Sequence, residues 1–170
     1  HWLRRLPERF EDLEVPLTVV ATHLETGDPT FFDAGPLREA VLASCALPPL
    51  YGPIDIEGVA YVDGGLAMNL PVTPLSGRGE AVVASEVNPR RGPQDGERAT
   101  TLGLVSRGLE LVFKAATAQE TALADVVVTP EGLDEVFLVD TAAADEAYRL
   151  GAEGMRAALR RPEVRRRLGV

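Results

Sequence analysis

Short apolar runs rich in β-branched residues alternate with amphipathic stretches along most of the chain, and this alternation is the strongest constraint on its fold. Runs that predict strands lie at residues 15–21, 30–32, 53–56, 59–63, 80–87 and 124–130. Apolar residues at three- and four-residue steps predict helices over residues 36–47, 101–124 and 142–160. Such alternation is typical of a layered α/β domain with a mostly parallel sheet flanked by helices. We expect one domain with a single core, because 170 residues are too few for two.

Composition narrows the classes of function. The net charge of −9 disfavours binding to nucleic acid and to anionic lipid surfaces, since both rest on a positive protein surface. Cys45 is the single cysteine, so no internal disulfide can form and a cytoplasmic location is expected. His1 and His23 are the only histidines, which argues against a zinc site. No apolar run approaches the roughly 18 residues of a membrane-spanning helix.

The stretch YVDGG places an aspartate between an apolar strand and two glycines. Gly64 and Gly65 permit backbone angles and close approaches that a side chain would forbid, so the chain can turn sharply and leave Asp63 projecting. In open α/β sheets, active sites gather at the carboxyl ends of strands. Asp63 is therefore either a catalytic carboxylate or a residue that hydrogen-bonds the backbone of its own turn, a common use of Asp.

Three stretches in the first half carry a family resemblance: VVATHLETG (19–27), LREAVLASCALPPLY (37–51) and YVDGGLAMNLPV (61–72). In order and spacing they resemble the C-terminal part of a bacterial patatin-like phospholipase domain. Downstream, VVASEVNP (82–89) and ADVVVTP (124–130) resemble the remaining strands of that family. The resemblance spans nearly the whole chain and implies an incomplete patatin-like α/β fold over residues 1–170.

The resemblance also implies an activity, the hydrolysis of phospholipids or other acyl esters by a Ser/Asp dyad. Asp63 would be the general base that activates the serine, and Gly64 and Gly65 would form the catalytic turn. A serine hydroxyl is a poor nucleophile until a neighbouring base takes its proton. Because an unperturbed Asp has a pKa of about 3.9, burial or close hydrogen bonding must support it in this role.

The nucleophile and the oxyanion hole of the family are not found in this sequence. The family's serine lies in a G-x-S-x-G turn, and no serine here has those neighbours, whether Ser44, Ser76, Ser85 or Ser106. We therefore expect residues 1–170 to be the C-terminal portion of one patatin-like domain, inactive alone. The start at His1, without Met, leads us to expect the serine-bearing half immediately upstream in the parent protein.

Two other functions fit the same residues. The chain could be a non-catalytic remnant that binds lipid or a partner protein, or one subunit of a split hydrolase. Loss of the central strands would leave residues 15–21 with an unpaired edge, through which we expect homo-oligomers or retention of the missing half. No metal or organic cofactor is implied.

Several other residues are assigned local roles. His23 is expected to make a local hydrogen bond, and Cys45 to be a small core residue. Asn69 and Pro71 are expected to shape the chain's exit from the turn. The arginines between 160 and 167 are expected on a solvated face, with transient membrane contact as the alternative. Residues 88–100 are expected to form a surface connector, with a lid over a lipid site as the alternative.

Overall fold

The computed structural model describes residues 5–79, 81–87, 100–133 and 143–170. The chain divides into two compact units, His1–Pro74 and Leu75–Val170. The described residues of each unit include buried apolar clusters of their own. The sequence, by contrast, predicts a single core. The assignment of residues 1–170 to one patatin-like domain stays a prediction.

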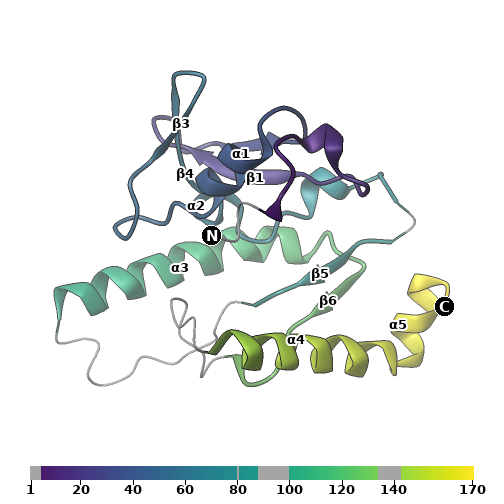
Figure 1. Ribbon diagram of the computed structural model, residues 1–170. Helices are drawn as coiled ribbons and strands as arrows, with labels where there is room; N and C mark the ends of the chain where they lie inside the picture. The colour runs from purple at the N-terminus through teal and green to yellow at the C-terminus, as the bar shows by residue number, and fades with distance from the viewer. Residues whose placement is uncertain (1–4, 80, 88–99, 134–142) are drawn as a thin grey trace. The chain divides into compact units, whose positions relative to one another are not determined.

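The first unit is built on a four-stranded sheet (Figure 1). Its strands are β1 (Val19–His23), β2 (Pro29–Phe32), β3 (Ile54–Ile56) and β4 (Val59–Asp63). They lie in the order β2-β1-β4-β3, and all three neighbouring pairs are antiparallel. The prediction of a mostly parallel sheet is therefore not confirmed for these strands.

Short connections explain two of the three antiparallel pairs. A short connection between two neighbouring strands allows only antiparallel pairing, because parallel strands need a crossover of a dozen or more residues. β1 and β2 are joined by residues 24–28, and β3 and β4 by Glu57 and Gly58 alone. Both residues of this two-residue turn have positive φ, 54° and 83°, as in the tight turns that suit hairpins. The strands predicted at residues 53–56 and 59–63 are confirmed, and Asp63 is the last residue of the second.

A short helix packs on the sheet. Helix α1 (Leu37–Ser44) contacts β1, β3 and β4. Its Leu37 is fully buried in a cluster with Phe10, Val19 and Ala40. The helix predicted over residues 36–47 is found over a shorter range, because Pro36 stands just before it with an extended backbone and the helix ends at Ser44.

The sequence predicts an unpaired strand edge at residues 15–21, and the sheet does not have one there. β1 lies inside the sheet, because its residues pair with β2 on one side and with β4 on the other. The outer strands among the described residues are β2 and β3. Ala21, the centre of β1, is fully buried, as suits an interior strand.

The second unit contains a parallel pair. β5 (Val83–Ser85) and β6 (Val126–Val128) pair in parallel, and α3 (Thr101–Thr121) lies between them in sequence, so the connection is long enough for parallel pairing. Helix α4 (Ala144–Leu159) packs Ala158 against β6, joined by side chains of α5 (Pro162–Leu168). β5, β6, α3 and α4 match strands and helices predicted from the sequence, whereas helix α5 was not predicted.

Some predictions cannot be compared with the structure. The connector or lid predicted for residues 88–100 lies outside the described residues except for Thr100, which caps α3 by accepting a hydrogen bond from the Gly103 N–H at 3.0 Å. Within the described ranges, no helix has both the length and the apolar character needed to cross a membrane.

Candidate active site

Asp63 is the last residue of β4, and its main chain is held from two sides. Its N–H donates to the carbonyl oxygen of Ala46 at 3.1 Å, just beyond α1. Its carbonyl oxygen accepts from the Thr22 hydroxyl on β1 at 2.8 Å. The end of the strand is thus fixed by two segments that are distant from it in sequence.

The Asp63 side chain is half-buried, and one of its oxygens is engaged by its own turn. The N–H of Gly65 donates to Oδ1 at 2.8 Å. In the described part of the chain, Oδ2 has no hydrogen-bond partner. Burial raises the pKa of Asp63 above its ordinary value, while the Gly65 hydrogen bond opposes that rise. Asp63 therefore makes the hydrogen bond to its own turn that the local interpretation predicts, and this bond uses only one of its two carboxylate oxygens.

Gly64 permits a close approach between two strands' ends. A Cβ atom at this position would lie 2.1 Å from the carbonyl oxygen of Val20 on β1, a separation that atoms cannot adopt. Its backbone angles, φ −64° and ψ −24°, are ordinary helical values. The sequence predicts both a special conformation and a close approach, and at Gly64 only the close approach applies.

After the two glycines the chain forms a one-turn helix, α2 (Gly65–Met68), which the sequence analysis did not predict. The N–H of Ala67 donates to the Thr22 hydroxyl at 3.2 Å, and that of Met68 donates to the Gly64 carbonyl at 2.8 Å. Asn69 ends this helix. The turn after Asp63 is therefore a short helical segment bound to β1.

A cavity of about 450 Å³ lies beside this turn, wholly within the first unit. Asp63, Gly64 and Gly65 line it. Its other lining residues come from β1 and the segment before it, the end of α1, and the stretch after Asp63: Leu17, Thr18, Val19, Val20, Val41, Ser44, Cys45, Met68, Asn69 and Pro71. Most of these are apolar, so the carboxylate belongs to the wall of a predominantly apolar cavity.

Cys45 differs from its prediction. Its side chain is exposed and lines the cavity, so the assignment as a small core residue is wrong. The helix ends at Ser44, and the chain leaves the helical path at Cys45, where φ is −105° and ψ is 3°. Shielding by the surrounding protein, together with the negative charge of Asp63, raises the pKa of the Cys45 thiol. A thiol with a raised pKa is a poor nucleophile at neutral pH.

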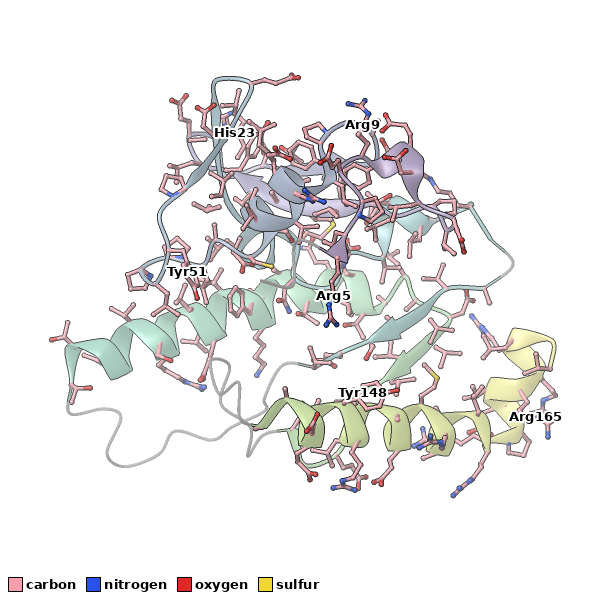
Figure 2. All side chains as sticks on the ribbon, viewed as in Figure 1. Arg5, Arg9, His23, Tyr51, Tyr148 and Arg165 are labelled. Atoms are coloured by element: carbon pink, nitrogen blue, oxygen red, sulfur yellow. The ribbon has the colours of Figure 1, made fainter. Side chains whose placement is uncertain are left out.

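The other candidate residues lie apart from this cavity or contribute to its wall. His23 is at the end of β1, as labelled in Figure 2, where its Nδ1 accepts from the Thr26 N–H at 3.4 Å and its ring meets Tyr61 edge-on. This agrees with the predicted local role. Of the chain's four serines, all within the described ranges, Ser44 alone lines the cavity. Asn69 and Pro71, predicted to shape the exit from the turn, also line it.

Thr22 is the residue of this site that the sequence analysis missed. It is buried, with 6% of its surface exposed, and its hydroxyl joins the end of β4 to α2. Its only signal in the sequence is a hydroxyl inside the apolar run of residues 19–22. Among the described residues, no group of three or more His, Cys, Asp or Glu side chains is placed to hold a metal ion.

The fold and site together define an α/β unit with a carboxylate presented at a strand end beside an apolar cavity. Residues 3–76 match the family model of patatin-like phospholipases, and this range contains the sheet, the Asp63 turn and the cavity. The resemblance predicted from the motifs is therefore confirmed for residues 3–76, which match a patatin-like phospholipase domain.

Relatives in mycobacteria extend this match. Uncharacterized NTE family proteins of Mycobacterium bovis and Mycobacterium tuberculosis are each 32% identical to the chain over 119 residues. The aligned part is 66% of this chain and 33% of each relative. The chain thus spans about a third of the length of the relatives it matches.

Proposed function

We propose that the chain supplies the general base of a lipid acyl hydrolase, and that Asp63 is this base in a Ser/Asp dyad. The observation that carries the proposal is the position of Asp63, half-buried at the end of β4 and in the wall of a largely apolar cavity. Ligand sites of this kind combine an apolar lining with a few placed polar groups. The match to patatin-like phospholipases favours acyl esters, including phospholipids, as the substrate class.

The chemistry needs one hydroxyl and one base. Asp63 accepts the proton of a serine hydroxyl while the serine oxygen attacks the ester carbonyl carbon. The tetrahedral intermediate then collapses, the proton passes from Asp63 to the departing alcohol, and an acyl-enzyme remains. Water hydrolyses this acyl-enzyme by the same proton transfers in reverse order. No step requires a metal or an organic cofactor.

The environment of Asp63 suits this role. Burial raises its pKa, which strengthens a carboxylate that would otherwise be a weak base. The Gly65 N–H holds Oδ1, so Oδ2 is the oxygen that we assign to the serine proton. Because general acid–base groups must lie within hydrogen-bond reach of their partner, the serine would reach Asp63 from the cavity side.

The serine is proposed to lie outside residues 1–170. None of the chain's serines stands in a G-x-S-x-G turn, and Ser44, the one in the cavity wall, is the last residue of α1. Residues 1–170 would then be the base-bearing part of one patatin-like domain. Oxyanion-hole donors, worth about 10²- to 10³-fold in rate each, would come from the same additional segment.

The test is an ester-hydrolysis assay of the parent protein, the longest product of the gene that contains residues 1–170. With short-chain p-nitrophenyl esters and phospholipid vesicles as substrates, Asp63→Asn is expected to lower kcat by about 10²- to 10⁴-fold. Asp55→Asn is the matched control, because Asp55 is an exposed carboxylate on the neighbouring strand β3. It should retain the activity of the unchanged protein.

Three outcomes bear on the proposal: two would contradict it, and one would place the serine on a separate polypeptide. An inactive parent protein without a G-x-S-x-G serine would indicate a non-catalytic remnant. A second polypeptide that co-purifies and brings the serine would indicate a split hydrolase. Equal activity of Asp63→Asn and Asp55→Asn would remove Asp63 from the reaction.

A further inference from the structure

The Thr22 hydroxyl connects three parts of the candidate site. It donates to the carbonyl oxygen of Asp63 at 2.8 Å and accepts from the N–H of Ala67 at 3.2 Å. Thr22 itself sits in the interior strand β1, paired with Val62 of β4 and Pro29 of β2. One buried hydroxyl thus ties the carboxylate-bearing strand end to the short helix that follows it.

The position of the Asp63 carboxylate depends on both ends of this connection. The carboxylate is held by the N–H of Gly65, the first residue of α2, and α2 is held to β1 through Ala67 and Thr22. The peptide between Asp63 and Gly64 is fixed by the same hydroxyl at its carbonyl oxygen. Removal of the hydroxyl would free this peptide and loosen α2, and with α2 the hydrogen-bond donor that orients the carboxylate.

We propose that Thr22 is a positioning residue for Asp63, acting through its hydroxyl and not through its bulk. This inference rests on the proposed role of Asp63 as the base. A threonine is suited to it because the branched side chain fits an interior strand position while the hydroxyl both donates and accepts. Valine has the same shape without the hydroxyl, and serine keeps the hydroxyl without the methyl group.

The experiment compares Thr22→Val with Thr22→Ser in the parent protein. Loss of orientation of a catalytic group costs up to about 10²-fold in rate, so Thr22→Val is expected to lower kcat by about 10- to 100-fold with KM unchanged. Thr22→Ser should keep kcat within a factor of about three, because the two hydrogen bonds remain. Thr22→Ala is a second variant without the hydroxyl, for use if Thr22→Val does not fold.

Two results would overturn the inference. A loss in Thr22→Ser as large as that in Thr22→Val would show that the hydroxyl alone does not position Asp63. A wild-type kcat in Thr22→Val or Thr22→Ala would show that the hydroxyl is dispensable.

A second measurement separates this inference from the proposed function. In the parent protein, amide hydrogen exchange at Ala67 and Gly65 should be faster by about 10-fold or more in Thr22→Val than in Thr22→Ser. This holds whether or not the parent protein hydrolyses esters. Unchanged exchange in Thr22→Val would refute the positioning role, whereas an inactive parent protein with the expected exchange would refute only the hydrolase.

Discussion

The backbone of Gly64 lies against the carbonyl oxygen of Val20 so closely that a Cβ atom at residue 64 would be 2.1 Å from that oxygen. The atom that such a Cβ would meet belongs to the main chain of an interior strand, so it cannot rotate out of the way. The glycine therefore determines how near the Asp63 turn can come to β1. Any side chain at this position would push the two apart.

Gly64→Ala is expected to destabilise the protein by about 3 kcal/mol or more, at the upper end of the range for overpacked sites. The matched control is Gly52→Ala, because a Cβ at Gly52 meets nothing within 4 Å and Gly52 lies outside the positive-φ region. Urea denaturation followed by circular dichroism measures both. Equal free energies of unfolding for the two variants would contradict the close approach.

Asp63→Asn is expected to raise the free energy of unfolding at neutral pH. Burial raises the pKa of Asp63 in the folded state. Such a group contributes its stability fully below its unfolded pKa, and this contribution is lost as pH rises through the folded pKa. The variant should therefore be more stable than the unchanged protein at pH 7, and the difference should vanish near pH 3, below the ordinary Asp value of about 3.9.

Thermal melts at a series of pH values test this expectation. If Asp63→Asn is instead less stable at pH 7, the carboxylate serves mainly to hold its own turn through Gly65. A catalytic carboxylate that costs stability is a common trade-off at active sites.

Cys45 provides a chemical probe of the same carboxylate. The negative charge of Asp63 contributes to the raised pKa of the thiol, and Cys45 is the single cysteine of the chain. Asp63→Asn should therefore lower the thiol pKa and speed alkylation by iodoacetamide at pH 8, because the thiolate is the reactive form. Asp55→Asn, on the exposed end of the sheet, should leave the rate unchanged. Rates measured across pH 7 to 10 give the pKa directly.

At position 57, in the turn between β3 and β4, another residue should give a more stable protein than the glutamate present. Glu57 has φ 54°, a left-handed conformation that costs free energy for most residues other than glycine and that Asn adopts more readily. Glu57→Asn is expected to stabilise the protein by up to about 1 kcal/mol. Glu57→Val should have the opposite effect, because a branched side chain tolerates positive φ poorly. Differential scanning calorimetry of the two variants gives the sign.

The sequence predicts most elements of this fold but not how the strands pair. The hairpin at Glu57 and Gly58, the helix after Pro36 and the strand ending in Asp63 are all indicated by local signals, namely turn residues and apolar periodicity. Pairing direction depends on connection length, and the two tight connections of the first unit impose antiparallel pairs. Alternation of strands and helices along the whole chain does not carry that information.

In the candidate site, too, the residues that depend on local sequence can be predicted, and those that depend on distant contacts cannot. Asp63 and Gly64 stand out in sequence because their chemistry is local to one turn. Thr22 does not, because the groups that its hydroxyl contacts lie 41 and 45 residues away. Cys45 was misassigned because one residue at the end of a helix decides whether its side chain faces the core or the cavity.

The tip of the β3–β4 hairpin is a suitable site for inserting tags or labels. Glu57 and Gly58 are exposed and lie at the opposite end of β4 from Asp63, which is anchored by Ala46 and Thr22. Affinity tags or fluorescent labels inserted at this tip would leave the anchors of the carboxylate in place. The protein could thus be immobilised or followed by microscopy through a graft that does not intrude on its cavity.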